Sequence, residues 1–177
     1  MADSASQRLF FGIWPDHRMR RGLAQMAATL RDYRGRPQHP QDLHITLVFI
    51  GQVTNEQYPC VLAAAEELQG RPFNLCIDRV GYWKRPGILW CGPSSVPAAL
   101  TDLVLKLQQG LQLCGFEAEK RTYCPHVTMA RKVINAPMLG ALAEPLSWPV
   151  DDFVLAASHT GADAPRYRVL KKWSLGS

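Results

Sequence analysis

A short motif occurs twice in this chain, and it constrains the fold more than any other feature. His44-Ile45-Thr46-Leu47 stands in the first half, and His126-Val127-Thr128-Met129 stands in the second. Each copy has a histidine, a β-branched residue, a threonine and a large apolar residue. Chance gives two His-x-Thr tripeptides in only about 2% of chains of this composition. We therefore expect one supersecondary unit to be duplicated, with a similar strand in each half.

The rest of the pattern predicts a mixture of strands and helices with short connections, which is an α+β class. Strands are expected at 9–14, 44–51, 73–80, 87–91, 126–131, 150–157 and 167–175. Helices are expected after Pro15-Asp16, at 56–68, and along the apolar positions from Leu100 to Leu111. The stretch 137–143 is expected to form only a short segment. No linker rich in serine or glycine divides the 177 residues, which suit one domain.

Charge and cysteine content narrow the class of protein. The formal charge of +5 favours an anionic partner such as RNA, a nucleotide or a phosphate. Neither a signal peptide nor an apolar stretch of about 20 residues is visible, so a soluble, cytoplasmic protein is expected. The five cysteines include no CxxC pair. We therefore expect buried thiols rather than disulfides, and no structural metal site.

The two motifs can carry acid–base chemistry. Residues i and i+2 of a strand project from one face, about 6.6 Å apart, so His44 and Thr46 share a face, as do His126 and Thr128. If the strands lie side by side, one cleft receives two imidazoles and two hydroxyls. A neutral histidine can then accept a proton while a protonated one donates to a leaving oxygen. This set suits hydrolysis or transesterification of a phosphodiester and requires no metal or cofactor.

The motif itself and one further group of residues can each be interpreted as structural or as functional. A single His-x-Thr is more often ordinary strand sequence, chosen for β-propensity, whereas the matched pair favours a site. Arg131 follows Thr128 by three residues and is expected to add a charge-assisted contact to a phosphate. The cluster Tyr82-Trp83-Lys84-Arg85 either stacks a base and holds a phosphate, or forms a hairpin tip with an exposed basic end.

At its two motifs the chain resembles the two-histidine phosphoesterase superfamily, whose signature is a duplicated His-x-Thr/Ser-x. The segments 43–51 and 125–131 are similar to the bacterial RNA 2′,3′-cyclic phosphodiesterase family, historically named 2′-5′ RNA ligase, and so are 8–12, 88–90 and 167–170. The resemblance implies a bilobal α+β fold, with two pseudo-symmetric lobes of antiparallel sheet and flanking helices around a central cleft. It would form a single domain over residues 1–177.

The resemblance also implies roles for individual residues. His44 would be the general acid that protonates the leaving O3′, and His126 would be the general base that activates water. The product would be a 2′-phosphate end, and a minor, ATP-independent 2′-5′ RNA ligation would use the same groups in exchanged roles. The implied substrate-binding residues are Thr46, Thr128 and Arg131 for the phosphate, and Phe49 near the base. Simple alternation, however, places Phe49 on the face opposite His44, where core packing is at least as good an interpretation.

The substrate implied is RNA with a 2′,3′-cyclic phosphate end, without cofactor, membrane or obligate protein partner. The nearest alternative keeps the chemistry and acts on small cyclic nucleotides, ADP-ribose cyclic phosphate or 2′-5′ oligonucleotides. A different class of function is an RNA-binding module without turnover. Two proton-transfer groups in matched positions argue against that class, because binding alone does not need them.

Overall fold

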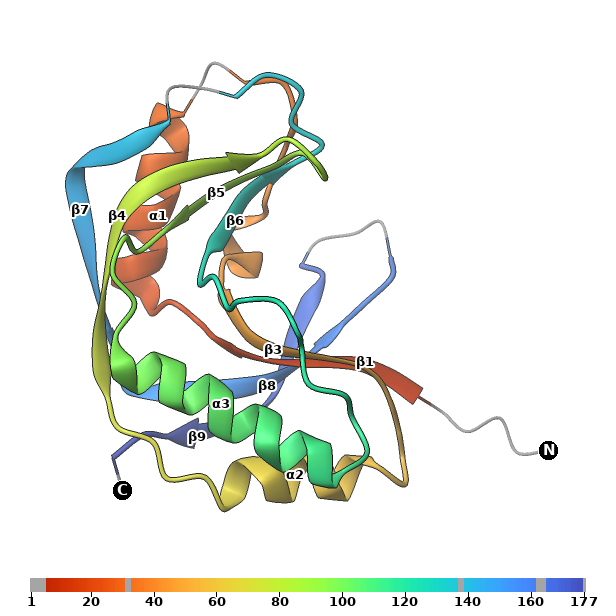
Figure 1. Ribbon diagram of the computed structural model, residues 1–177. Helices are drawn as coiled ribbons and strands as arrows, with labels where there is room; N and C mark the ends of the chain where they lie inside the picture. Colours follow the sequence, from red (N-terminus) through yellow and green to blue (C-terminus); the bar gives the residue numbers. More distant parts are fainter. Residues whose placement is uncertain (1–5, 31–32, 137–138, 162–164, 177) are drawn as a thin grey trace.

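The computed structural model describes residues 6–30, 33–136, 139–161 and 165–176, and it has the expected α+β, bilobal architecture (Figure 1). The elements are β1 (Ser6–Ile13), α1 (His17–Thr29), β2 (Arg36–Pro37), the short 3-10 helix η1 (Pro40–Asp42), β3 (Ile45–Thr54), α2 (Tyr58–Glu66), β4 (Phe73–Trp83), β5 (Ile88–Gly92), α3 (Ala98–Leu113), β6 (Val127–Arg131), β7 (Gly140–Val150), β8 (Asp152–Ser158) and β9 (Tyr167–Ser174). Among the described residues, no helix has the length and apolar character needed to cross a bilayer.

The strands form two antiparallel halves that meet at the repeated motifs. The strand order is β7-β4-β5-β6-β3-β1-β8-β9, and β2 adds to the far end of β6. We call β3, β1, β8 and β9 the first lobe, and β7, β4, β5 and β6 the second lobe. Where the lobes meet, β3 and β6 are joined through the pair Ile45 and Val127. Because this junction is narrow, the two halves diverge on either side of it (Figure 1).

Helices from each lobe cover the other lobe. The helix α1 follows β1 of the first lobe but packs against β7 of the second. A Cβ added at Gly22 of α1 would lie 3.3 Å from the Leu146 side chain of β7. The helix α3 follows β5 of the second lobe but packs against β3 of the first, with α2 beside it (Figure 1). One apolar core therefore extends under both lobes.

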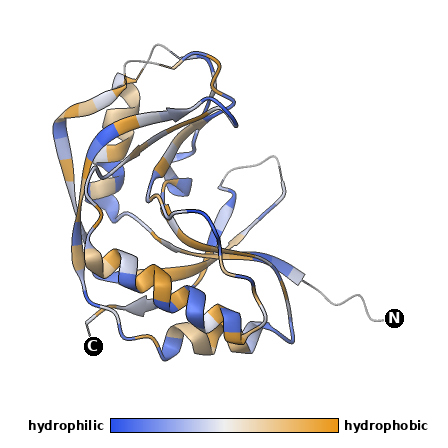
Figure 2. Ribbon diagram, viewed as in Figure 1, coloured by the Kyte–Doolittle hydropathy of each residue, from blue (hydrophilic) through white to orange (hydrophobic). Residues whose placement is uncertain are grey.

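Most predicted elements are present, and the local sequence signals behind them, such as a helix cap or a periodic row of apolar residues, act in the structure as expected. Asp16 caps α1, because its Oδ1 accepts a hydrogen bond of 2.6 Å from the Met19 N–H. In α3, the spacing of three and four residues turns a row of apolar side chains inward; Leu100, Leu103, Val104, Leu107 and Leu111 are all buried. Figure 2 shows apolar residues along this helix and along the strands that it covers.

The strand β7 was not predicted. The stretch 137–143 was expected to form only a short segment, of which residues 137–138 lie outside the described part. Instead, Gly140–Val150 pairs with β4. Pro145 and Pro149 argue against a central strand because proline cannot donate to a ladder. The strand β7 lies at the edge of the sheet, where that loss is tolerated.

The expectation that the cysteines are buried thiols holds for Cys91 alone, because two of the five form a disulfide and two others are exposed. Cys60 of α2 and Cys114 at the end of α3 form a disulfide, with their Cα atoms 5.7 Å apart. A Cβ at Gly110 would lie 2.9 Å from the Ala64 Cβ, so the two helices approach closely enough for the bond. That contact joins positions far apart in the sequence, which the spacing of cysteines does not reveal. Of the other three, Cys91 is buried, whereas Cys76 and Cys124 are exposed.

Candidate active site

The structure brings the histidines and threonines of the two motifs together at the junction of the lobes. In the antiparallel pairing, Ile45 lies opposite Val127. His44 is therefore next to Thr128 across the junction, and Thr46 is next to His126. Ile45 and Val127 are completely buried, so the polar residues on either side of each project from the opposite face, toward the cleft.

The two imidazoles are held in the same way. His44 Nδ1 lies 2.7 Å from the Asp42 carbonyl oxygen, and His126 Nδ1 lies 2.8 Å from the Cys124 carbonyl oxygen. A carbonyl only accepts, so each Nδ1 carries the proton and donates it. Each Nε2 is then left for chemistry, and the Thr46 hydroxyl lies 3.2 Å from the Nε2 of His44.

His44 lies in an aromatic box made by the first lobe. The Trp14 ring stacks on the imidazole at 4.5 Å with an angle of 7°, and Tyr167 and Phe10 complete the box. Burial lowers the pKa of His44 to about 4, because the imidazolium loses hydration. Asp42 offsets part of this effect, whereas the nearby charges of Arg131 and His126 lower the pKa further.

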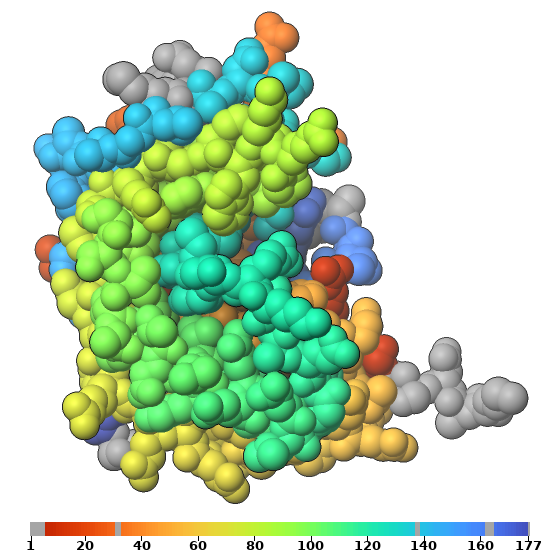
Figure 3. Space-filling model, viewed as in Figure 1, coloured from red at the N-terminus to blue at the C-terminus, as the bar shows by residue number. Residues whose placement is uncertain are grey.

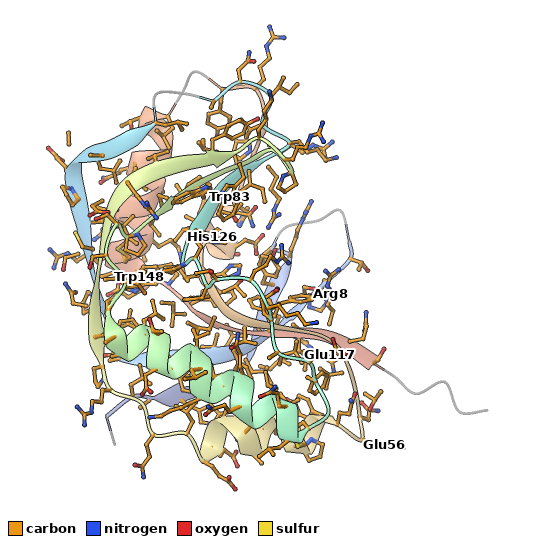
Figure 4. The ribbon with its side chains drawn as sticks, in the orientation of Figure 1. Arg8, Glu56, Trp83, Glu117, His126 and Trp148 are labelled. Carbon is orange, nitrogen blue, oxygen red and sulfur yellow. A yellow bond between two sulfur atoms is a disulfide. The ribbon has the colours of Figure 1, made fainter. Side chains whose placement is uncertain are left out.

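His126 faces the aromatic wall of the second lobe. Its ring meets the edge of Trp83 at 4.5 Å and lies 6.4 Å from Trp90 (Figure 4 labels His126 and Trp83). Trp90 lies across β4 at Gly81, where a Cβ would come 2.1 Å from the indole. Burial lowers the pKa of His126 below its usual value, and the charge of Arg131 contributes in the same direction.

A β-bulge directs Arg131 into the cleft. Along the pair of β5 and β6, Trp90 lies opposite Thr128, but Leu89 lies opposite Ala130, so Met129 is an extra residue on β6. The extra residue shifts the alternation by one position. Ala130 consequently faces the core, where it is completely buried, and Arg131 returns to the face of His126 and Thr128.

The first lobe contains a matching β-bulge in β3. Because of it, the prediction from simple alternation that Phe49 faces away from His44 is wrong. Gly12 of β1 lies opposite Thr46, but Phe11 lies opposite Val48, so Leu47 is an extra residue on β3. Phe49 therefore faces the cleft side and is 54% exposed, with the Arg8 guanidinium 4.9 Å above its ring. Phe49 and Arg131 each follow a motif histidine by five residues, so they occupy equivalent positions in the two lobes.

The side chains of Asp42 and Tyr123 hold the site together through hydrogen bonds. The Asp42 side chain is buried, and it accepts hydrogen bonds from the backbone N–H groups of Arg166 and Tyr167 at 2.9 and 3.2 Å. It thus fixes the start of β9, including the Tyr167 ring that packs on His44. Across the junction, the Tyr123 hydroxyl donates to the Thr46 carbonyl at 3.1 Å.

A groove of about 790 Å³ lies beside His126. In Figure 3, the surface is hollowed between the tip of the β4–β5 hairpin and the segment that leads to β6. The groove is lined by Thr46, Phe49, Trp83, Arg85, Tyr123 and His126, among others. Trp83 and Arg85 thus line the groove, whereas the Tyr82 hydroxyl donates to the Val133 carbonyl and Lys84 is exposed. The hairpin cluster therefore divides between the groove and ordinary packing.

Sequence reasoning missed Trp14, Phe10, Tyr167 and Trp90 as parts of the site. Their only signal was their aromatic character, and apolar residues in strands are more often core residues. Asp42 was also missed, because its role depends on a contact with β9, far away in the sequence. In the part of the chain that the structure describes, no three His, Cys, Asp or Glu residues gather as a metal site would require.

Comparison with known proteins identifies relatives of this chain. Residues 13–90 match the family described as LigT like Phosphoesterase. The chain is 31% identical to the RNA 2′,3′-cyclic phosphodiesterase of Escherichia coli K12, over 97% of this chain and 98% of that protein. It is also 31% identical to the protein of the same name from Thermus thermophilus, with 95% and 90% covered.

Solved structures show the same likeness. The crystal structure of E. coli LigT complexed with 3′-AMP superposes with a TM-score of 0.90 at 29% identity, covering 98% of this chain and all of that one. A crystal structure from T. thermophilus gives a TM-score of 0.80 at 27% identity, covering 95% and 97%. With the repeated motif, the bilobal fold and relatives along almost its whole length, the chain belongs to the LigT-like phosphoesterases.

Proposed function

We propose that this enzyme hydrolyses the 2′,3′-cyclic phosphate at RNA ends to a 2′-phosphate by general acid–base catalysis. The observation that carries the proposal is the pair of imidazoles on one cleft, each held through Nδ1 by a backbone carbonyl, with Nε2 left for proton transfer. The names of the relatives, RNA 2′,3′-cyclic phosphodiesterase, and the 3′-AMP complex of E. coli LigT support the choice of substrate.

In the proposed mechanism, the two histidines work on opposite sides of the phosphorus atom. His126 Nε2 accepts a proton from water while the water oxygen attacks phosphorus. The bond from phosphorus to O3′ breaks, and His44 donates the proton that O3′ needs to leave. The 2′-phosphate remains, and proton exchange with solvent restores both histidines.

The phosphate is held by groups that the two lobes contribute. In the proposal, the Thr46 and Thr128 hydroxyls and the Arg131 guanidinium bind the non-bridging oxygens, whose negative charge must be stabilised during attack. Phe49, exposed at the equivalent position of the first lobe, lies near the base. The reverse reaction, in which a 5′-hydroxyl reacts with the cyclic phosphate, would give the minor 2′-5′ ligation. A cytoplasmic location stays a prediction from the sequence.

In this proposal, the phosphate of a bound substrate allows a histidine with a low pKa to serve as an acid. With a pKa of about 4, His44 is mostly neutral near pH 7 in the free enzyme. A phosphate anion in the cleft stabilises the imidazolium and raises this pKa. The substrate would thus help to protonate the acid that acts on it.

The test uses an RNA oligonucleotide with a 2′,3′-cyclic phosphate end, in EDTA, with separation of 2′- and 3′-phosphate products. We expect a 2′-phosphate, and a loss of about 10²–10⁴-fold in kcat for His44→Ala and for His126→Ala. His17→Ala, an exposed histidine on α1, is the matched control and should retain full activity. Wild-type turnover by either of the first two variants would refute the two-histidine mechanism. If the enzyme turned over small cyclic phosphates but not the RNA oligonucleotide, the substrate would be a small cyclic phosphate and not RNA.

A further inference from the structure

Two arginines lie directly opposite each other where β2 pairs with the end of β6. Arg36 of β2 is the cross-strand partner of Arg131 of β6. Residues that are directly opposite in an antiparallel pair project from the same face. Since the bulge at Met129 turns Arg131 toward the cleft, Arg36 projects from the cleft face as well, one strand farther out.

This arrangement is unfavourable without an anion. Like charges directly opposite each other destabilise a strand pair. Among the ion pairs of the described residues, none includes Arg36 or Arg131. Arg36 is also exposed, so its guanidinium is accessible to a ligand in solution.

The surrounding surface extends the positive charge. The Val133 N–H donates to the Gly87 carbonyl, and the Ile134 N–H donates to the Arg34 carbonyl, so the hairpin tip, the end of β6 and the segment before β2 meet here. This convergence brings together the exposed cations Arg34, Lys84, Arg85 and Lys132. None of them forms an ion pair within the described part of the chain.

We propose that Arg36 binds the next phosphodiester of the RNA chain, on the 5′ side of the terminal nucleotide, while Arg131 contacts the reacting phosphate. This inference rests on the proposed function and adds a contact to a second phosphate of the RNA substrate. A cyclic mononucleotide has one phosphate and cannot occupy the second position. An RNA chain supplies both anions, and their binding relieves the repulsion between the two guanidinium groups.

The experiment compares two substrates in Arg36→Gln: adenosine 2′,3′-cyclic phosphate and a short RNA oligonucleotide that ends in the same cyclic nucleotide. We expect kcat/KM to fall about 10-fold for the oligonucleotide and to stay unchanged for the mononucleotide. The salt dependence of oligonucleotide turnover should also weaken by about 0.7 in the slope of log(kcat/KM) against log[salt]. Arg21→Gln, which removes an exposed charge from α1, is the matched control and should change neither substrate.

Two results would overturn the assignment. An equal loss with both substrates would place Arg36 on the reacting phosphate, and no loss with either would leave it without a role in binding. Fluorescence anisotropy with an RNA oligonucleotide that ends in a 2′-phosphate gives a readout without turnover. Weaker binding to Arg36→Gln than to wild type would support the second phosphate site even if the enzyme opened neither cyclic phosphate. Equal binding would refute the site in that case.

Discussion

His44 and His126 share one hydrogen-bond pattern but have different surroundings. Each Nδ1 donates to the carbonyl two residues earlier, which fixes the ring without adding a carboxylate partner. The stacked Trp14 and the edge of Tyr167 enclose His44 more completely, and its pKa falls to about 4. The two copies of the motif therefore contain histidines that differ in chemistry, because different side chains surround them.

The low pKa of His44 predicts how stability depends on pH. Between its unfolded pKa of about 6.5 and its folded pKa of about 4, the unfolded chain binds more protons. The free energy of unfolding should therefore fall as the pH falls through this window, by about 3 kcal/mol from this group. Urea denaturation at several pH values measures the effect.

The variant His44→Gln provides the comparison. Without a titrating group at this position, its stability should change less between pH 6.5 and 4 than that of the wild type, with the remaining slope partly due to His126, whose pKa is also lowered. If the variant and the wild type showed the same slope, His44 would not be buried as a neutral imidazole.

At the scale of elements, the bulges decide which side chains of the motif strands face the cleft. A regular strand would direct Phe49 and Arg131 away from the histidines. The extra residues Leu47 and Met129 rotate the following positions, so each motif presents three side chains to the cleft: the histidine, the threonine, and the residue five after the histidine. The same bulge in both lobes agrees with an origin by duplication.

The α2–α3 pair gives an element-scale prediction. The disulfide between Cys60 and Cys114 closes a loop with a sequence separation of 54, which restricts the unfolded chain. We expect the double variant Cys60→Ala/Cys114→Ala to lose about 2–4 kcal/mol of unfolding free energy. Chemical denaturation measures it, and wild type in dithiothreitol should behave like the double variant. Cys76→Ser, at an exposed free thiol, is the control. A wild-type midpoint that does not respond to the reductant would contradict the prediction.

At the scale of the whole molecule, two helices join the lobes, because each follows a strand of one lobe and packs on the other lobe. The helix α1 packs on β7 of the second lobe, and α3 packs on β3 of the first. Neither lobe can lose its partner without exposing apolar surface that a helix from that partner covers. We therefore expect the lobes to fold as one domain, with the cleft kept at their junction.

This coupling predicts one unfolding transition. In calorimetry, the measured enthalpy should equal the van't Hoff enthalpy, as for other cooperative single domains. Leu23→Ala, at a completely buried residue of α1, should lower the free energy of unfolding by about 2–5 kcal/mol and keep a single transition. Two separate heat-absorption peaks, in either protein, would mean that the lobes are independent domains.

The sequence by itself determined the α+β class, most of the strands and helices, and the face that the histidine and threonine of each motif share, because these depend on local periodicity and on the repeat of His-x-Thr. Only the tertiary structure decided what depends on contacts between distant segments. The bulges that direct Phe49 and Arg131, the edge position that admits β7 with its prolines, and the approach of α2 to α3 that forms the disulfide all follow from pairing partners. The periodicity of a strand does not determine its pairing register. The set of side chains that face the cleft therefore follows only from the pairing of the strands in the folded protein.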